Sequence, residues 1–490
     1  MNITDYLLQQ CKDEDIALIT PKREYTYREL KQATAGMIEA FQSAGINSGD
    51  RVGILGSNSL FWVSSYLAGM KMGVVTVPLA TKLPPSELTL RIEQTGCKGL
   101  CVEKRLQKRY GGAFSNSLFV MNEDAFEVEH AAAQLSESAI DFDEHQDAAW
   151  MLTSGTTARP RIVRITHANI RANTDAIIES LGLTRADRIM AILPFYYCFG
   201  TSLLHTHLRV GGSLVPGDTL GFPEKVLDLM EQTACTGFAG VPTTFQMYLR
   251  NSTFPQRAMP ALRHIQQAGG KLSPVLIDEL TQSRPRADIY IMYGQTEATA
   301  RLSCLQPEDL PSKLGSIGKG IPGVSLQVLN EDGKEVHDGE VGEIVARGGN
   351  ISPGYVGEPE INAEKFVHGS LRTGDMATVD EDGYIYIVDR KSDFIKSYGN
   401  RVSSQEIEAC ILEIKEVTAA AVIGVPDPLR GEAIRAFVVL RANAVFNEAT
   451  VIEYCAKRLA RYMVPKDVIF TRSLPVNEHG KVVKSELRKL

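Results

Sequence analysis

The sequence predicts an α/β fold: a large N-terminal domain of mixed and parallel sheets flanked by helices, then a small mobile α+β C-terminal domain. The 490 residues are too many for one ordinary domain and can bury a large core. A hydrophobic content of 44% and a charged content of 23% are typical of a soluble globular protein. Strand-like and helix-like segments alternate through residues 1–150, as in sheets whose strands are joined by helices.

The first elements follow this alternation. A helical pattern begins at Tyr27 and is closed by Gly45. A strand at Arg51–Leu55, a helix over Leu60–Met72 and an apolar strand at Val74–Pro78 come next. These residues carry little chemistry, and we expect them to form the scaffold.

A cluster of small hydroxylated residues around one glycine follows the apolar residues near position 151. It comprises Thr153, Ser154, Gly155, Thr156 and Thr157. Gly155 lets the backbone turn tightly and aim its N–H groups at one point, while Arg159 and Arg161 add positive charge. Such a loop suits the phosphates of a nucleotide, although an ordinary Ser/Thr-rich turn between two strands has the same composition.

A second candidate site lies at Ala191–Gly200, where an apolar strand ends in aromatic residues and a helix over Thr201–Val210 follows. This order places Tyr196, Tyr197 and Phe199 at the carboxyl end of a strand, where ligands bind in open α/β sheets. The same spacing is typical of an aromatic core cluster, so packing is the alternative.

Charge, hydropathy and cysteine spacing exclude several classes of protein. The net charge of -7 argues against a general nucleic-acid binder, whose surface would be basic. The first residues lack the basic start and apolar core of a signal peptide, and the roughly 18 consecutive apolar residues of a membrane span occur nowhere. The eight cysteines show no metal-ligand spacing, so we interpret them as buried or free thiols. We therefore expect a cytoplasmic protein with no nucleic-acid partner and no membrane span.

The C-terminal part of the sequence reads as a compact α+β unit. Its predicted helices are Ser404–Ile414 and Thr450–Leu459, and its predicted strands are Thr418–Gly424, Ala433–Leu440 and Val468–Thr471. A border at 388–391 divides the chain into an N-terminal domain, residues 1–388, and a C-terminal domain, residues 389–490. The polar segment Asn477–Lys484 is expected to be a mobile loop that carries Lys481.

Short motifs follow one another along the chain. They are TSGTT at 153–157, AGGKL at 268–272, YGQTE at 293–297, TGD at 373–375, DR at 389–390 and GK at 480–481. In this order they resemble the motifs of the adenylate-forming superfamily, which comprises acyl- and aryl-CoA synthetases, luciferases and stand-alone adenylation enzymes. Ala158 stands where that family usually has glycine and should stiffen the first loop, whereas Arg161 replaces the usual lysine and keeps its charge.

The resemblance implies a two-step reaction. A carboxylate attacks the α-phosphorus of ATP, giving an acyl-adenylate and pyrophosphate, and a thiol then takes the acyl group. The implied cofactors are ATP and Mg²⁺, with CoA or phosphopantetheine as the thiol. A small carboxylic acid is the implied substrate, and a carrier protein acting in trans is left open as a partner. Kinship with luciferases also leaves an oxidoreductase open, but no residue points to one.

The resemblance also assigns roles to single residues. The expected nucleotide-binding residues are Thr153, Ser154, Gly155, Thr156, Thr157, Gly269, Gly270, Tyr293, Gly294, Gln295, Asp375 and Arg390. Tyr293 would stack on adenine, and Asp375 and Arg390 would contact the ribose. Thr296 would bond the α-phosphate, and Glu297 would hold Mg²⁺, which prefers carboxylate and phosphate oxygens. Lys271, beside the two glycines, would lie at the surface or face the pocket, and the surface is favoured.

Two lysines would divide the two half-reactions between them. Lys481 would bridge the carboxylate and the α-phosphate in the first step. The C-terminal domain would then rotate about Asp389, so that Lys481 leaves and the side that bears Lys396 enters for thiol transfer.

The expected acid pocket is formed by Tyr196, Tyr197, Phe199, Gly200 and Val241. Amino-acid-activating members of the superfamily tend to have aspartate at the position of Tyr196, where it pairs with the α-ammonium group. A buried ammonium without a counter-charge costs several kcal/mol, so Tyr196 favours an acid without an α-amino group. A stand-alone amino- or imino-acid adenylating enzyme that loads a carrier protein is the alternative, and a nucleotide-binding protein without catalysis is a third hypothesis.

Overall fold

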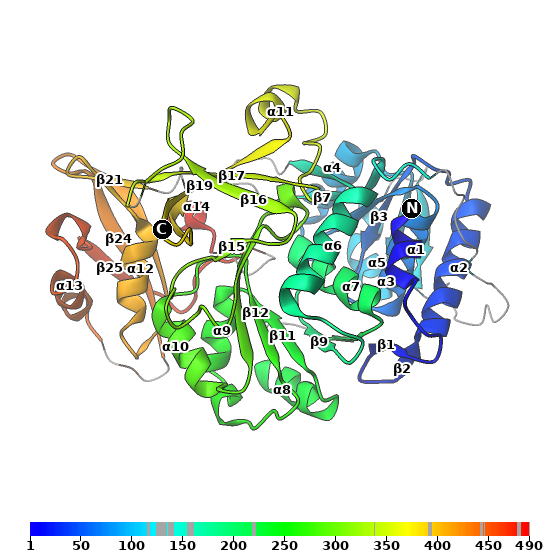
Figure 1. Cartoon of the computed structure of the whole chain (residues 1–490), viewed down its shortest axis with the longest axis horizontal. Helices are drawn as coiled ribbons and strands as arrows, with labels where there is room; N and C mark the ends of the chain where they lie inside the picture. Colours follow the sequence, from blue (N-terminus) through cyan, green and yellow to red (C-terminus); the bar gives the residue numbers. More distant parts are fainter. Residues whose placement is uncertain are drawn as a thin grey trace.

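The computed structural model describes residues 1–114, 118–123, 135, 142–153, 161–217, 222–337, 339–390, 394–441, 444, 446–477 and 482–489. These residues form two large sheets with helices around them, an antiparallel sheet, and a smaller C-terminal unit with a sheet of its own. Figure 1 shows the C-terminal unit, coloured orange and red, at one end of the molecule. The predicted architecture of a large α/β part and a small α+β part is confirmed, whereas the mobility of the small part stays a prediction.

The first sheet contains the strands expected at the start of the chain. In spatial order these are β6 (Phe119–Asn122), β5 (Gly99–Val102), β3 (Arg51–Leu55), β4 (Val75–Leu79), β7 (Asp147–Leu152) and β8 (Ile162–Thr166). Neighbouring strands are parallel, except that β7 and β8 pair antiparallel. The Ser/Thr-rich segment therefore leaves the sheet at the carboxyl end of β7.

The second sheet provides the edge on which the candidate site is built. In spatial order its strands are β15 (Lys319–Gly320), β14 (Ser303–Leu305), β13 (Asp288–Tyr293), β12 (His264–Gln267), β11 (Gly237–Gly240), β9 (Arg188–Ala191), β10 (Ser213–Pro216), β1 (Ile16–Ile19) and β2 (Glu24–Thr26). The strands from β1 to β13 are parallel, so that their carboxyl ends lie along one edge. Ligands bind at such edges in open α/β sheets.

Helices cover the two large sheets and fill the space between them. They are α1 (Ile3–Leu8), α2 (Tyr27–Ser43), α3 (Leu60–Lys71), α4 (Pro85–Thr95), α5 (Lys104–Tyr110), α6 (His167–Leu181), α7 (Cys198–Val210), α8 (Pro223–Gln232), α9 (Pro242–Arg250) and α10 (Pro274–Ser283). The α2 helix begins at Tyr27, as predicted, because the side chains of Thr26 and Glu29 cap each other's backbone N–H groups. Residues of α3 are buried on every face, which explains why its sequence is mostly apolar.

An antiparallel sheet follows and carries two predicted site residues. Its strands are β16 (Val324–Leu329), β17 (Gly342–Gly348), β19 (Ser370–Val379) and β18 (Phe366–Val367), with β20 (Ile385–Arg390) beside β19. The helix α11 (Pro359–Lys365) precedes β18. Strands β19 and β20 place Asp375 directly opposite Arg390.

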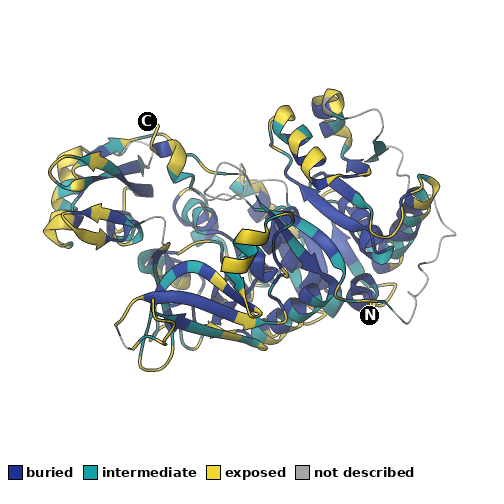
Figure 2. Ribbon diagram, turned by 90° about the horizontal axis from the view of Figure 1, so that it is seen from above, coloured by how far each residue is buried: buried dark blue, intermediate teal, exposed yellow. Residues whose placement is uncertain are grey.

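The C-terminal unit has a hydrophobic core of its own, separate from the cores of the large sheets. Its strands are β22 (Asn400–Val402), β21 (Ile395–Ser397), β24 (Gly431–Leu440), β23 (Val417–Asp427) and β25 (Asp467–Phe470), and its helices are α12 (Ser404–Leu412), α13 (Glu448–Ala456) and α14 (Lys484–Leu487). The helices and strands predicted here are present, with ends shifted by up to three residues. Figure 2 shows buried residues along the strands and exposed residues on the outer face of this unit.

Arg250 of α9 links the large part to the C-terminal unit through hydrogen bonds. Its buried guanidinium donates to the carbonyls of Leu412 and Val417, at 3.1 Å to the Leu412 oxygen. It also pairs with Glu279 of α10 at 2.7 Å. In the described part of the chain, no helix combines the length and the apolar character needed to cross a lipid bilayer.

Candidate active site

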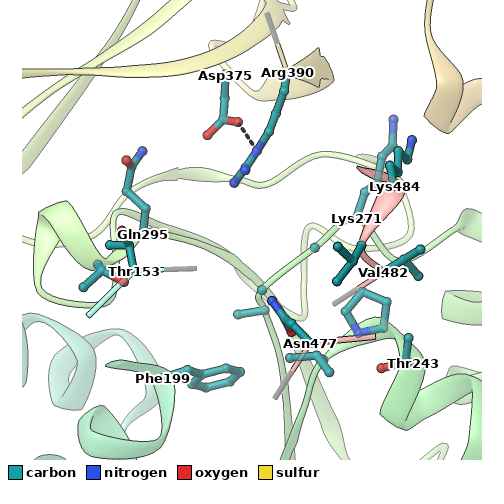
Figure 3. A pocket seen from close by; sticks show the side chains of 18 of the residues that line it. Thr153, Phe199, Thr243, Lys271, Gln295, Asp375, Arg390, Asn477, Val482 and Lys484 are labelled. Carbon is teal, nitrogen blue, oxygen red and sulfur yellow. Dashed lines mark ion pairs between the residues drawn. The ribbon is translucent and has the colours of Figure 1, made fainter. Parts of the chain in front are cut away.

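A cavity of about 680 Å³ lies between the carboxyl edge of the second sheet and the C-terminal unit. The large part contributes, among others, Thr153, Arg161, Phe199, Val241, Gly270, Gln295, Glu297, Asp375 and Arg390, and the C-terminal unit contributes Gln405, Glu408, Leu412, Asn477, Val482 and Lys484. Figure 3 shows Asp375 and Arg390 on one side of this space and Phe199 on the other. The fold therefore brings motifs that are far apart in the sequence to one place.

Thr153 and Arg161 hold the two ends of the Ser/Thr-rich segment together. The backbone N–H of Thr153 donates to the Arg161 carbonyl at 2.9 Å, and the Arg161 N–H donates to Thr153 Oγ1 at 3.3 Å. Both residues line the cavity, and the Arg161 guanidinium lies 5.4 Å from the ring centre of Tyr355. The other predicted members of this loop are outside the described residues: Ser154, Gly155, Thr156, Thr157 and Ala158.

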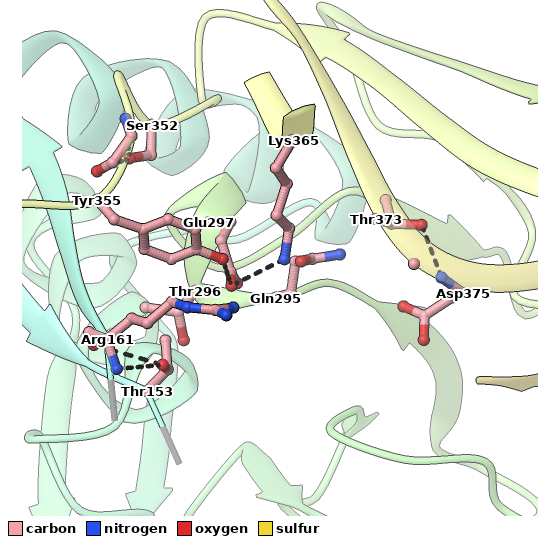
Figure 4. Close-up of polar contacts among 12 residues, drawn as sticks. Thr153, Arg161, Gln295, Thr296, Glu297, Ser352, Tyr355, Lys365, Thr373 and Asp375 are labelled. Atoms are coloured by element: carbon pink, nitrogen blue, oxygen red, sulfur yellow. Dashed lines mark hydrogen bonds and ion pairs between the residues drawn. The ribbon is translucent and has the colours of Figure 1, made fainter. Parts of the chain in front are cut away.

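Glu297 is a buried carboxylate on the cavity wall, only 8% exposed. Its Oε1 accepts a hydrogen bond from the Tyr355 hydroxyl at 2.5 Å and pairs with Lys365 Nζ at 3.2 Å (Figure 4). Burial raises the pKa of Glu297, but the charge of Lys365 and the Tyr355 hydrogen bond outweigh it and hold the pKa below its ordinary value. The carboxylate is therefore ionised at neutral pH.

The donor set around Glu297 fits a hard divalent cation. Among the described residues, no cluster of three or more His, Cys, Asp or Glu side chains could cage a metal ion. Mg²⁺ does not require such a cage, because proteins usually hold it through one or two carboxylates together with substrate phosphates and water. Glu297 supplies such an oxygen beside the segment that suits phosphates.

Asp375 and Arg390 form an ion pair on the opposite side of the cavity, with Arg390 Nε 3.3 Å from Asp375 Oδ1. The other carboxylate oxygen of Asp375 accepts a hydrogen bond from the Tyr293 hydroxyl at 2.6 Å. Tyr293 itself is buried in a core cluster and is not part of the cavity wall that the described residues form. In this structure its hydroxyl orients Asp375, and its ring is packed against neighbouring side chains.

The segment after β13 runs along the cavity wall. Gly294, Gln295 and Thr296 line it, as do Gly269 and Gly270 after β12. Only glycine fits at position 294, because a Cβ there would lie 1.9 Å from the carbonyl oxygen of Ala300. This close approach folds the chain back on itself immediately after Glu297.

Lys271 is exposed to solvent, as expected, but it also borders the cavity. Its side chain lines the space, and its Nζ donates to the carbonyl of Ile387 at 3.0 Å. No residue pattern indicates this contact, because Ile387 lies on a strand of a different sheet.

Three of the residues expected in the acid pocket line the cavity: Tyr197, Phe199 and Val241. The α7 helix begins at Cys198, three residues before the predicted start, because the N–H of Tyr197 bonds back to the Pro194 carbonyl at 3.0 Å and turns the chain early. Phe199 therefore lies in the first turn of the helix and not on a strand end.

Tyr196 and Gly200, the other two residues expected in the pocket, are buried but are absent from the cavity wall of the described residues. A Cβ at Gly200 would lie 2.1 Å from the carbonyl oxygen of Pro194. Gly200 thus permits the tight turn into α7, and the width of the cavity depends on other residues.

Asp389 connects the large part to the C-terminal unit. Its fully buried carboxylate accepts hydrogen bonds from the backbone N–H and the hydroxyl of Ser404, both at 2.9 Å, and from the Ser403 hydroxyl at 3.3 Å. The last strand of the large part therefore caps the first helix of the small one. Arg390 follows it directly and reaches the cavity.

The two predicted lysines differ in what the structure describes. Lys481 lies outside the described residues, but Asn477 and Val482 on either side of it line the cavity. Lys396 is an exposed residue of β21 whose backbone N–H donates to Glu432 at 2.6 Å. It is not part of the cavity wall in this arrangement of the two parts.

Sequence reasoning missed four residues at this site: Tyr355, Lys365, Arg301 and Lys484. Lys484 pairs with the partly buried carboxylate of Glu408 at 2.8 Å on the cavity wall. None of the four belongs to a motif, and their partners are distant in sequence. Only the three-dimensional arrangement distinguishes them from surface residues of the same type.

Comparisons with known proteins identify the family of the chain. Residues 8–356 match the family model for AMP-binding enzyme, and residues 406–481 match that for AMP-binding enzyme C-terminal domain. A feruloyl-CoA synthase from Amycolatopsis sp is 31% identical, covering 95% of this chain and 93% of the relative. A 2-succinylbenzoate–CoA ligase from Bacillus velezensis is 30% identical, covering 99% and 98%.

A solved structure has the same architecture throughout. It is an anthranilate CoA ligase in complex with anthranoyl-AMP, 26% identical, with a TM-score of 0.92 over 100% of this chain and 97% of that one. The predictions of ATP-dependent acyl-adenylate formation and of a thiol acceptor are confirmed at the level of the family. The chain therefore belongs to the AMP-binding enzymes of the adenylate-forming superfamily and is an AMP-forming acid–thiol ligase.

Proposed function

We propose that this ligase joins a small carboxylic acid without an α-amino group to CoA by way of an acyl-adenylate. The observation that carries the proposal is that one cavity contains both the ionised carboxylate Glu297, flanked by basic groups, and an aromatic pocket at Phe199. Such a space can hold a polyanion and an apolar acid side by side. Reaction between two anions requires this proximity together with neutralisation of their charge.

The phosphates of ATP would lie at the phosphate end of the cavity, which we define as Thr153, Arg161, Glu297 and Lys365. Bound Mg²⁺ would neutralise the phosphates beside Glu297. Lys365, which pairs with that carboxylate at 3.2 Å, is placed to turn its charge toward the phosphates. The buried position of Glu297 strengthens these interactions, because little water screens them.

The ribose would bind at Asp375 and Arg390, whose ion pair fixes a carboxylate oxygen at the cavity wall. The hydroxyl of Tyr293 holds the second carboxylate oxygen of Asp375. The acid would occupy the acyl end, which we define as Tyr197, Phe199, Val241 and Arg301. Aromatic acids are the first candidates because the relatives are a feruloyl-CoA synthase and a 2-succinylbenzoate–CoA ligase.

Lys481 is the proposed cation that bridges the acid and the α-phosphate in the first half-reaction. The position of Asn477 and Val482 on the cavity wall supports this role. For the second half-reaction, we propose that the C-terminal unit turns about Asp389 and presents the face that bears Lys396. Both half-reactions would then use one pocket.

CoA is the proposed acceptor, in line with the CoA ligases among the relatives. A carrier protein in trans is the less supported acceptor. We further propose a cytoplasmic location, because no disulfide joins any of the eight cysteines, all of which lie among the described residues.

The test is acid-dependent exchange of pyrophosphate into ATP over a panel of aromatic, aliphatic and amino acids. We expect exchange with acids that lack an α-amino group. Acids that support exchange are then offered CoA or a phosphopantetheinylated carrier protein, and we expect thioester formation with CoA. Exchange confined to amino acids, or transfer confined to the carrier, would contradict the proposal.

A further inference from the structure

Arg301 is the one charged side chain of the acyl end as we define it. It lies between the 3₁₀ turn η4 (Thr296–Ala298) and β14, and it is 2% exposed. The side chain nevertheless contributes to the cavity wall. A fully buried arginine that borders a ligand cavity is unusual, because arginines are rarely buried without a charged partner.

The backbone holds Arg301 in place from both sides. Its N–H donates to Asn173 Oδ1 at 3.1 Å, and its carbonyl accepts from Asn173 Nδ2 at 2.9 Å and from Asn350 Nδ2 at 2.7 Å. Thr299, two residues earlier, has a φ of +66°, which is costly for a β-branched residue. The fold thus maintains a strained turn that fixes the direction in which Arg301 leaves the chain.

No anion among the described residues balances this cation. Its Nε and Nη2 atoms are buried without a hydrogen-bond partner there. The titratable groups that act on its charge are Tyr197, Cys198 and Cys304. Burial raises the pKa of Tyr197 and raises that of Cys304 to about 12, so neither carries a negative charge at neutral pH.

The Phe199 ring compensates for only part of the burial. The guanidinium carbon lies 4.5 Å from the ring centre, close enough for a cation–π contact. Removing an ion from water costs more free energy than one such contact supplies. Burial lowers the pKa of Arg301 to about 10, so the side chain remains a cation at neutral pH. Among the described residues, this charge therefore lacks an anionic partner, which an anionic ligand would supply.

The phosphates of ATP are not the best candidates for that partner. The phosphate end already contains Arg161, which lies over Tyr355, and Lys365, which pairs with Glu297. Of the groups around Arg301, Tyr197, Cys198 and Phe199 lie at the start of α7 and belong to the acyl end or adjoin it, and Cys304 lies on β14. An anion at Arg301 is therefore part of the acid itself.

We propose that Arg301 binds a second anionic group of the acid substrate, remote from the carboxylate that is adenylated, so that the preferred substrate is a dicarboxylic acid. The inference rests on the proposed function of the cavity as the site of acid activation. It also sharpens the case against amino acids, since an unpaired guanidinium repels an ammonium group. Arg301 is thus a specificity-determining residue whose planar fork of donors suits a carboxylate.

The test compares matched pairs of acids, each an aliphatic or aromatic dicarboxylic acid and its monomethyl ester. With the wild-type protein, we expect pyrophosphate exchange with a kcat/KM about 10²-fold higher for the best diacid than for its ester, because the ester leaves the buried cation unpaired. In Arg301→Met, exchange with the diacid falls about 10²-fold, mainly through KM, while exchange with the ester is unchanged or improved. Arg301→Lys retains part of the preference for the diacid.

Thermal unfolding separates this role from a structural one. Replacing an unbalanced buried charge by an apolar side chain of similar length should leave the melting temperature unchanged or raise it. A lower melting temperature in Arg301→Met, with equal losses for diacid and ester, would show that Arg301 supports the fold or contacts the reacting groups, and would overturn the inference. Exchange with monoacids alone would overturn it too, yet leave the proposed function intact. Exchange with no acid, despite ATP binding by calorimetry, would contradict the proposed function itself.

Discussion

The two ends of the cavity differ in how far protein groups neutralise the buried charge. At the phosphate end, Glu297 is neutralised by Lys365 and held by Tyr355, so the charges are balanced within the protein. At the acyl end, Arg301 is equally buried but is balanced only in part, by the face of Phe199. A ligand at the first end must exchange partners with an existing pair, whereas a ligand at the second end must bring the missing partner. The first arrangement favours stability of the empty protein, and the second favours discrimination between substrates.

The largest effect is expected when the anion of the phosphate end is removed. In Glu297→Gln, the pyrophosphate exchange rate should fall about 10³-fold, because the neutral amide cannot supply the anionic oxygen that Mg²⁺ requires. Asp187→Asn is the control, because this carboxylate is also buried and pairs with Arg263 away from the cavity. The control should lose stability without losing exchange per folded molecule. Exchange at the wild-type rate in Glu297→Gln would contradict the proposed role of the Glu297 carboxylate at the phosphate end.

Lys481 and Lys396 test whether the phosphate end is served by different cations in the two half-reactions. Lys481→Ala should lower exchange about 10²-fold or more, as does removal of a preorganised charged donor elsewhere. Lys396→Ala should leave exchange intact and impair thioester formation. Both half-reactions are measured for each variant with one acid. Normal exchange in the first variant, or equal damage to both steps in the second, would refute the assignment.

Lys365→Met tests the charge balance between Lys365 and Glu297 at the phosphate end. It leaves the Glu297 carboxylate unpaired and should destabilise the protein by about 2 kcal/mol, less than for a fully buried pair because Lys365 is partly exposed. Chemical denaturation of Lys365→Met and Arg301→Met gives the contrast, since only the former should be less stable than wild type. Adding Glu297→Gln to Lys365→Met should restore stability. Equal stability losses in the two single variants would remove the distinction between the ends.

The smallest effect concerns the partial partner at the acyl end. Phe199→Leu removes the ring under the guanidinium and should lower stability by about 1 kcal/mol beyond the loss of apolar surface. The double variant with Arg301→Met isolates the free energy of the cation–π contact, because the ring has no cation to bind once Arg301 is replaced. A coupling energy near zero between the two positions would show that Arg301 is stabilised by something other than Phe199.

Most of the scaffold could be predicted from the sequence, because its signals are local. The strand at Arg51–Leu55 and the start of α2 at Tyr27 follow from apolar pattern and from the cap formed by Thr26 and Glu29. The start of α7 was predicted three residues late, since the turn at Pro194 depends on a backbone contact that leaves no residue pattern.

The site could be predicted only where residues belong to motifs. Asp375 and Glu297 were found in this way, and both line the cavity. The role of Gly200 was not foreseen, because the carbonyl that excludes a side chain there comes from a turn rather than from the pocket. Arg301 and Lys365 could not be predicted as site residues. The role of a buried cation depends on the groups that surround it, and those groups come from other elements.

The contacts of Asp389 restrict which backbone torsion angles can change when the C-terminal unit rotates. Its carboxylate is bound to the first residue of α12, and the Ser403 hydroxyl donates to the Val388 carbonyl at 2.8 Å. A turn of the small part that keeps these contacts must carry the end of β20 with it, so the change of torsion angles has to fall before Val388. A turn taken up after Asp389 would instead remove the Asp389 carboxylate from the start of α12, which would keep its Ser403 cap, at a cost of about 1 kcal/mol. The hydrogen bonds between Asp389 and the start of α12 therefore determine which peptide units can change conformation when the C-terminal unit rotates.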